Sequence, residues 1–241
     1  MYFCDCSLKK YIMAFFVIEG LDGAGKSTQL ELLKDHFANI GKKTEYIHFP
    51  TTDSPIFGDL VSRFLRGEFG GIKDVNPYLV ALLFAGDRYN LKNKINSWLE
   101  EGKIVINDRY VFSNIGFQCA KMNNAKEADE LFDWIFNLEF EYFKIPKPDL
   151  SIFLDVPFSF TENKLKQTRE GKDREYLQGK KDIHEEDLNF QKSVRKTYLR
   201  AIEKYPNLII RIDCSDDNGQ ILSPESISKL IIKEIERRFT F

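Results

Sequence analysis

The sequence lacks the features that would place the chain in a specialised class. Its 241 residues include only four cysteines, none of them in a C-x-x-C pair, and no apolar run long enough to cross a membrane. Lysine and arginine (35) almost balance aspartate and glutamate (37), so the formal net charge is −2. Without a basic excess, a nucleic-acid polymer is disfavoured as a partner. The cysteine pattern favours reduced thiols in a cytoplasmic protein over a disulfide framework or a metal cluster.

Internal repeats and linkers are also missing. Hydrophobic residues make up 43% of the chain, which is typical of a globular core. Short apolar strands alternate with helical patterns, and this predicts an α/β fold with a parallel sheet covered on both faces. We expect one domain over residues 13–241, preceded by an accessory or disordered extension over 1–12. A signal peptide is rejected there, because the apolar run that follows is itself a strand of the domain.

The chain is organised around a phosphate-binding loop. Phe15–Glu19 indicates a buried strand, and the residues that follow fit G-x-x-x-x-G-K-[ST] before a helical pattern begins. Glycines let the backbone direct several N–H groups at a phosphate placed on the helix N-terminus. Lys26 can reach the outer phosphates, and Ser27 can bind magnesium. The predicted ATP-binding residues are Gly20, Leu21, Asp22, Gly23, Ala24, Gly25, Lys26, Ser27 and Thr28.

This loop leaves the reaction open. GTPases, ATPases and small-molecule kinases all carry it, although the lack of an N-K-x-D segment disfavours a GTPase. An accidental glycine-rich turn is disfavoured because the required strand and helix flank the motif. None of the three histidines, His36, His48 and His184, lies in a triad-like pattern, so no histidine base is predicted.

A second group of polar residues follows the predicted strand Lys103–Asn107. Asp108 at the strand end can face the phosphate loop and hold magnesium, directly or through water. Arg109 beside it can bind a phosphate through two nitrogens. The competing interpretation is a structural ion pair, but a phosphate loop in the same sheet favours a functional one.

Four segments together resemble the thymidylate kinases, a family of P-loop nucleoside monophosphate kinases. They are the phosphate loop, Leu82–Arg88, Asp108–Gln118 and Pro148–Pro157, and the likeness runs from Met13 to the C-terminal helix. It implies a three-layer P-loop NTPase fold with a five-stranded parallel sheet, flanking helices and a short lid. It also implies a homodimer and Mg²⁺-dependent transfer of the ATP γ-phosphoryl group to dTMP in dTTP synthesis.

The resemblance assigns roles to individual residues. Lys26 would follow the transferred group, and Asp22 would lie near the acceptor phosphate that Arg109 clamps. The implied metal ligands are Ser27, Asp22 and Asp108. Phe84 would stack on thymine, which is worth about 1–3 kcal/mol per base, although its spacing alone indicates core packing, as does that of Phe117. The full implied acceptor site is Pro50, Phe84, Arg88, Arg109, Ser113, Asn114 and Phe117.

A basic segment over about 161–187 is interpreted as the lid. Some relatives carry a basic residue in the phosphate loop where this chain has Gly23, so positive charge must come from elsewhere. Arg169 and Arg174 are the predicted catalytic lid residues, against the alternative of a solvated helix. The acidic run Asp182–Asp187 resembles a segment that places one carboxylate near the sugar or metal, without indicating which. Thr52 stands where many relatives have an arginine that contacts phosphate.

Two other functions remain open from the sequence. A deoxynucleoside kinase would use a hydroxyl acceptor and benefit from a carboxylate base, and a regulatory protein would bind ATP without turnover. The expected helix Ala128–Phe143 has a broad apolar face, which is compatible with burial against the sheet or with a second subunit.

Overall fold

The sheet has five parallel strands, as the sequence predicts. The computed structural model describes residues 14–166, 172–180, 182–185 and 187–241, except the side chains of 172–174. The strands lie in the order β2-β3-β1-β4-β5. Their bounds are β1 Ala14–Gly20, β2 Thr44–His48, β3 Ile104–Asp108, β4 Leu150–Asp155 and β5 Ile209–Asp213.

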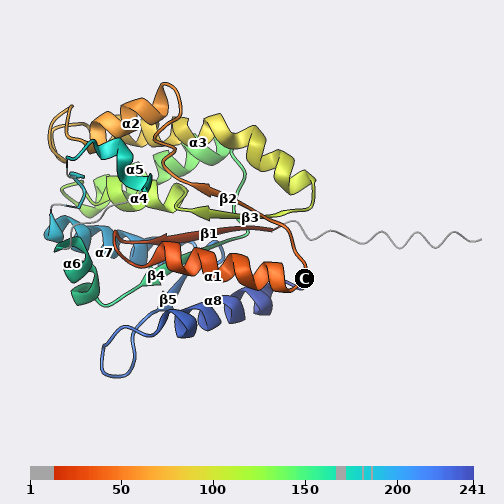
Figure 1. Cartoon of the computed structure of the whole chain (residues 1–241). Helices are drawn as coiled ribbons and strands as arrows, with labels where there is room; N and C mark the ends of the chain where they lie inside the picture. Colours follow the sequence, from red (N-terminus) through yellow and green to blue (C-terminus); the bar gives the residue numbers. More distant parts are fainter. Residues whose placement is uncertain (1–13, 167–171, 181, 186) are drawn as a thin grey trace, which may run out of the picture.

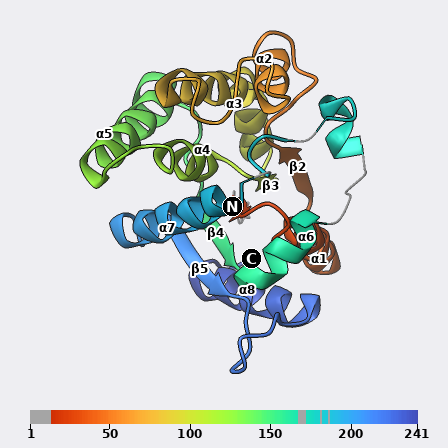
Figure 2. The same ribbon diagram turned by 90° about the vertical axis from the view of Figure 1, so that its left-hand side faces the viewer.

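Helices cover both faces of this sheet, which gives three layers (Figures 1 and 2). One face is covered by α1 and α8, and the other by α3, α4 and α7, with α2 and α5 packed outside them. Among the described residues, none of the helices is both long and apolar enough to cross a bilayer. The bounds are α1 Lys26–Asn39, α2 Phe57–Leu65, α3 Pro77–Glu100, α4 Val111–Cys119, α5 Ala125–Phe136, α6 Phe158–Lys166, α7 Leu188–Lys204 and α8 Pro224–Arg238.

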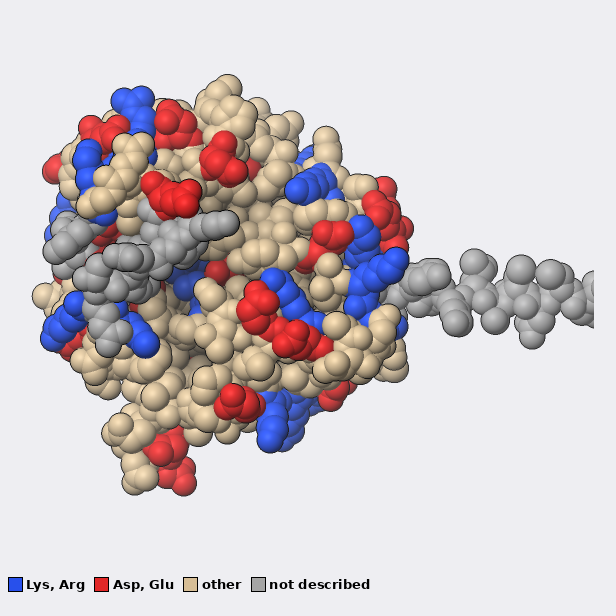
Figure 3. All heavy atoms as spheres, in the orientation of Figure 1, with Lys and Arg blue, Asp and Glu red and all other residues tan. Residues whose placement is uncertain are grey.

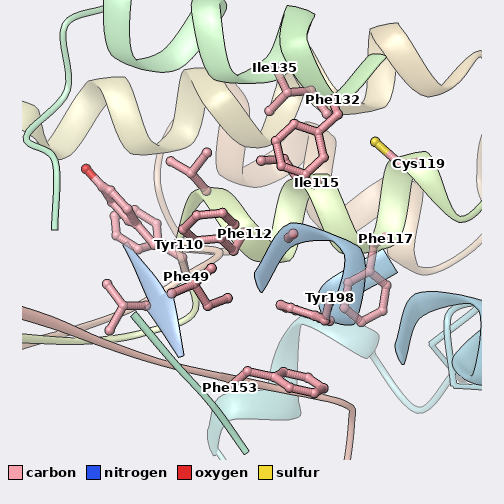
Figure 4. Packing of buried hydrophobic residues seen from close by; sticks show 14 of the residues in the cluster. Phe49, Tyr110, Phe112, Ile115, Phe117, Cys119, Phe132, Ile135, Phe153 and Tyr198 are labelled. Atoms are coloured by element: carbon pink, nitrogen blue, oxygen red, sulfur yellow. The ribbon is translucent and has the colours of Figure 1, made fainter. Parts of the chain in front are cut away.

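Strand β1 connects the two hydrophobic layers because its side chains alternate between the faces of the sheet. Phe15 and Val17 belong to the cluster under α3, α4 and α7, part of which Figure 4 shows. Phe16 and Ile18 belong to the cluster under α1 and α8. All seven residues of β1 are buried, as expected for the central strand of a parallel sheet.

The expected helix Ala128–Phe143 differs in the structure. It begins at Ala125, after Asn124, whose side chain accepts from Glu127 N, and ends as an α-helix at Phe136. Six residues of π-helix follow, η1 Asn137–Tyr142. The apolar face of α5 packs within the chain, against α4 and Tyr205. Sequence periodicity missed the change because six residues are too few to distinguish an α-helical from a π-helical pattern.

The buried carboxylate of Glu19 joins β1 to the turn after β3 and to α7. Its Oε1 accepts from the backbone N–H groups of Tyr110 (3.0 Å) and Ser113 (3.2 Å). Its Oε2 accepts from the hydroxyls of Ser113 (2.5 Å) and Tyr198 (2.9 Å). Burial raises the pKa of Glu19, and the hydrogen bonds from the Ser113 hydroxyl, the Tyr198 hydroxyl and Tyr110 N act against that rise together with the charge of Arg109. The turn that carries Arg109 is therefore fixed from inside the core.

We expect Glu19→Ala to lower the free energy of unfolding by about 3 kcal/mol or more, because four buried donors lose their acceptor. Glu19→Gln is the matched control: one oxygen still accepts from both backbone groups, and the amide can donate to the hydroxyls, so its cost should be about 1 kcal/mol. Urea denaturation of the two variants measures the difference. Equal losses would contradict this account, because glutamine, which keeps the volume and an acceptor oxygen, would then stabilise the fold no more than alanine does.

Candidate functional site

A cavity of about 770 Å³ lies at the carboxyl ends of β1, β2 and β3, where open α/β sheets bind ligands. Both groups of predicted residues line it. From the phosphate loop come residues 22–28. The predicted metal ligand Asp108 lines the cavity too, and so do all the predicted acceptor residues: Pro50, Phe84, Arg88, Arg109, Ser113, Asn114 and Phe117. Gly20 and Leu21 lie behind the lining and take part through their carbonyl groups. The residues grouped by sequence reasoning therefore meet in one cavity.

The phosphate loop has the backbone that its glycines allow. Gly23 and Gly25 have φ angles of 76° and 79°, which other residues rarely adopt, and α1 begins directly afterwards. Lys26, only 8% exposed, folds back so that its Nζ donates to Leu21 O at 3.1 Å. Burial and the charge of Arg109 lower the pKa of Lys26 to about 8, against the opposing effect of nearby carboxylates. A phosphate of ATP would be a stronger partner for this ammonium than a backbone carbonyl.

Arg109 joins the two ends of the cavity. Its backbone has a positive φ of 65°, and its guanidinium donates to Gly20 O (2.9 Å), Ser113 Oγ (3.1 Å) and Asp22 Oδ1 (2.5 Å). It also lies over the Phe117 ring, 5.2 Å from the centroid. Burial alone would lower the pKa of Arg109, but Asp22 and other acidic groups raise it above its ordinary value. The side chain is thus a fixed cation between loop and acceptor residues.

The oxygen atoms near Lys26 suit a hard divalent cation. The Oδ2 atom of Asp108 lies 3.0 Å from His48 Nδ1. Its other oxygen, Oδ1, is buried and has no hydrogen-bond partner among the described residues. Burial raises the pKa of Asp108, but His48 and Lys26 outweigh this, so the net pKa is lowered and the carboxylate is ionised at neutral pH. Asp22 and the Ser27 hydroxyl line the same cavity. Such a set of oxygen donors fits Mg²⁺. Within the described part of the chain, no group of three or more His, Cys, Asp or Glu side chains forms a complete metal site.

At the other end of the cavity, Arg88 is held by a residue that sequence reasoning missed. Glu139, from the π-helix η1, binds Arg88 Nε at 2.5 Å and Nη2 at 2.6 Å, with both side chains nearly fully buried. Asn114 Nδ2 donates to the same carboxylate at 3.0 Å. A lone glutamate on an apolar helix face was the available signal. Its partner could not be identified, because Arg88 lies 51 positions earlier in the chain.

The predicted lid is only partly described. It contains α6 and the 3-10 helix η2 Lys172–Leu177. Arg169 and the side chain of Arg174 lie outside the described residues. Among the lid side chains that are described, Lys164 is the one cation in the cavity lining. A Cβ added to Gly23 would lie 2.9 Å from the Lys164 Cβ, so the glycine allows α6 to approach the phosphate loop.

The end of η2 and the segment after it form one wall of the cavity. Tyr176, Asp182, His184 and Glu185 line it, and Gln191 Nε2 connects His184 O (2.8 Å) with Asp22 Oδ2 (3.0 Å). Burial raises the pKa of Asp182 to about 7, with Asp22 and Glu185 adding to the rise. Of the acidic run, Glu186 lies outside the described residues and Asp187 begins α7 as its N-cap.

The loop after β2 departs from the expected phosphate contact. Thr52 is not part of the cavity lining. Instead the loop is tied to α3 by the buried Asp87, which accepts from Thr51 N at 2.8 Å, from the Thr51 hydroxyl, and from Ser54 Oγ at 3.0 Å. The loop thus has a structural anchor, and the residue at the position of the expected phosphate contact is an uncharged threonine.

The end of the cavity near α1 was not predicted. Its apolar lining comes from Phe160 and from a distant C-terminal segment, Ile221, Leu222, Pro224 and Ile227. Gln29 on α1 ties this segment down by donating to Pro224 O at 3.0 Å. Flat apolar walls next to a phosphate loop suit the base of a nucleotide. Elsewhere on the visible face, charges of both signs alternate, without a large area of one sign (Figure 3).

Comparison with known proteins gives the same family from three directions. A family model described as thymidylate kinase matches residues 18–223. A probable thymidylate kinase of Thermococcus kodakarensis is 35% identical over 201 residues, which cover 81% of this chain and 87% of that protein. One of Pyrobaculum aerophilum is 36% identical over 198 residues, which cover 80% of this chain and 86% of that protein. The structure of a thymidylate kinase from Candida albicans matches with a TM-score of 0.67 and 25% identity, covering 93% of this chain and 91% of that one.

These matches extend over the phosphate loop, the Asp108–Arg109 turn and the segment that contains the predicted lid. The structural match also agrees with the five-stranded parallel sheet. The chain belongs to the thymidylate kinase family.

Proposed function

We propose that this protein transfers the γ-phosphoryl group of ATP to dTMP, giving dTDP and ADP. The observation that carries the proposal is the single cavity with a phosphate loop at one end and a cation, aromatic rings and a polar base-reading pair at the other. A phosphate oxygen of dTMP would form the new P–O bond as the bond between the γ-phosphorus and the β–γ bridging oxygen breaks. That oxygen leaves with ADP.

The residue roles rest on position and charge. We assign Lys26 and the loop N–H groups to the ATP phosphates, and Arg109 to the dTMP phosphate. No general base is needed, because the attacking oxygen is already ionised at neutral pH, so catalysis consists of positioning and charge neutralisation. Mg²⁺, held by Ser27, Asp22 and Asp108, would neutralise charge on the β- and γ-oxygens.

The acceptor base is assigned to the far end of the cavity. Phe84 is half-buried and Phe117 is 7% exposed, so both can offer a ring face without leaving the core. Pro50 adds an apolar wall, and Arg88 with Asn114 supplies polar contacts. This arrangement favours a pyrimidine monophosphate over a free nucleoside, because the Arg109 guanidinium, which Asp22 orients, provides a cation for the acceptor phosphate between the base and the phosphate loop.

A coupled ADP-release assay with ATP and Mg²⁺ tests the proposal against dTMP, dUMP, dCMP, AMP and thymidine. We expect dTMP to be the best acceptor. Phosphorylation of thymidine without turnover of dTMP would instead support a deoxynucleoside kinase. ATP binding with no turnover of any acceptor would support a regulatory protein. The free buried thiols of Cys119 and Cys214 are compatible with a cytoplasmic site of action, which we propose with the activity.

Replacing Arg109 by alanine should remove about 2–5 kcal/mol of transition-state stabilisation for dTMP, because a buried phosphate contact is lost. The measurement is kcat/KM for dTMP, with circular dichroism to confirm folding. Arg237→Ala, an exposed arginine on α8, is the control and should leave kcat/KM unchanged. An unchanged rate in Arg109→Ala would mean that another group holds the acceptor phosphate.

We also propose that residues 13–241 form one domain with a lid over about 161–187, and that Lys164 is one of its functional cations. It lies beside Gly23, the loop position at which some relatives carry a basic residue. Arg169 and Arg174 remain the proposed arginines of the lid. Positive charge from this segment would stabilise the equatorial oxygens of the transferred group.

Lys164→Met should lower kcat by about tenfold or more with little effect on KM for dTMP, because it removes charge near the transferring group. Lys166→Met is a close control, since Lys166 lies on the same helix, pairs with Glu162 at 2.7 Å and does not line the cavity. Lys164→Arg should retain most of the activity. If Lys164→Met and Lys166→Met behave alike, Lys164 is only a surface charge.

For the homodimer, we propose α3 as the contact rather than α5. Leu79, Leu82 and Tyr89 occupy one face of α3 and are 59%, 37% and 48% exposed. Ile56, the residue directly before α2, is 71% exposed. The apolar face of α5 is already buried within the chain. A second copy of this chain would cover the exposed stripe of α3.

Analytical ultracentrifugation should give the mass of a dimer for the parent protein and of a monomer for Leu79→Glu, because a charge would be buried without a partner. Leu230→Glu provides the control: this residue is an exposed leucine too (37%, against 59% for Leu79) but lies on α8, across the sheet, and the variant should remain a dimer. A monomeric parent protein would contradict the proposal.

A further inference from the structure

A buried carboxylate determines what the base end of the cavity can recognise. Glu139 is fully buried, and its two oxygens accept from Arg88 Nε, Arg88 Nη2 and Asn114 Nδ2. Burial alone would lower the pKa of Arg88, but the Glu139 charge outweighs this and the net pKa lies above its ordinary value. Both partners of Glu139 line the cavity, whereas Glu139 itself does not.

This geometry fixes the orientation of the Asn114 amide. Its Nδ2 donates to Ala81 O and to Glu139 Oε1, each at 3.0 Å. The reversed amide would place an oxygen against two acceptors, so it is excluded electrostatically. Asn114 Oδ1 is therefore the end left over, and it is buried without a partner among the described residues. An acceptor in that state gains most from a ligand that brings an N–H group.

The same carboxylate also restricts Arg88. Because Glu139 takes Nε and Nη2, Nη1 is the nitrogen that remains for a ligand, and it makes no hydrogen bond within the described part of the chain. The cavity thus has one donor from α3 and one acceptor from α4, both oriented by a third residue. Sequence spacing alone could not show that Asn114 offers its acceptor to a ligand, since an asparagine can present either its oxygen or its NH2 group.

We infer that Glu139 is a positioning residue that makes the acceptor site selective for pyrimidines with a carbonyl at C4 and a proton on N3. Thymine and uracil present an acceptor at C4 and a donor at N3, which complement Arg88 Nη1 and Asn114 Oδ1. Cytosine presents an amino group and an unprotonated N3, so both positions would oppose like groups. The inference rests on the proposed acceptor site and adds the origin of its base selectivity.

The π-helix explains how a glutamate reaches this position. The chain from Asn137 to Tyr142 has an extra residue per turn, and Glu139 and Phe140 are its buried members. π-Helical turns are often found at functional sites because they shift side chains out of α-helical register. Here the shift brings a carboxylate into an otherwise apolar layer between α3 and α4.

The test compares kcat/KM for dTMP, dUMP and dCMP. We expect the parent protein to prefer dTMP over dCMP by at least about hundredfold, since two polar contacts are mismatched. Glu139→Gln should lower that ratio by at least about tenfold, because one oxygen cannot satisfy three donors. The ratio of dTMP to dUMP should not change, since both bases share the edge that Glu139 acts on and differ only in the 5-methyl group.

Two further variants separate positioning from loss of structure. Glu139→Asp keeps the charge beside Arg88 but withdraws it by one methylene, so it should fold and also lower the dTMP-to-dCMP ratio. If Glu139→Gln does not fold, Glu139→Asp decides the question. Phe140→Leu changes the neighbouring residue of η1, which packs on Phe136, and should leave the ratio unchanged.

The inference is overturned if folded Glu139 variants retain the parental dTMP-to-dCMP ratio. It is equally overturned if Phe140→Leu lowers the dTMP-to-dCMP ratio as much as the Glu139 variants do. A change in the dTMP-to-dUMP ratio of kcat/KM in the Glu139 variants would overturn it as well. Failure of the proposed function looks different: the parent protein would then phosphorylate none of the three monophosphates.

Discussion

The buried carboxylate of Glu19 is the constraint on which the site depends. It accepts four hydrogen bonds that arise from the turn after β3 and from α7, and so fixes where α4 begins. Arg109 lies in that turn with a positive φ, a backbone state that costs free energy unless its surroundings enforce it. With the turn fixed, the Arg109 guanidinium can lie between Gly20, Asp22 and Ser113 without losing conformational freedom when a ligand binds.

Local sequence signals were sufficient to predict the sheet and the proximity of the phosphate loop to the turn after β3. The loop Gly20–Thr28 and the turn Asp108–Tyr110 follow buried strands directly, so parallel strand order brings them together. Contacts between distant segments were not predictable: Glu139 with Arg88, Gln191 with Asp22, and Pro224 with Gln29. Each depends on a helix path that periodicity does not specify, and in the first case on a π-helix that changes which side chain faces inward.

The distribution of charge explains why the cavity suits an anion although the net charge of the chain is −2. Lys26 and Arg88 are 8% and 2% exposed, and the Arg109 side chain is 11% exposed, so all three carry their charge within a low-dielectric region. Each has a carboxylate or carbonyl partner that prevents the cost of an isolated buried cation. A phosphate entering this cavity meets cations that are already desolvated and oriented, which strengthens the interaction compared with one at the surface.

Ser113 and Asn114, two neighbouring residues of α4, contact different buried acids and lie at different ends of the cavity. Ser113 is held by Glu19 on the side of the phosphate loop, and Asn114 is held by Glu139 on the side of the base. The first turn of α4 is thus fixed by two buried acids, each of which also lies within a network that contains one arginine of the cavity. Because the two acids act on different side chains, separate interactions fix the two places that we propose for the acceptor phosphate and the base. A change in base preference therefore need not disturb the geometry of phosphoryl transfer, even though both depend on the same helical turn.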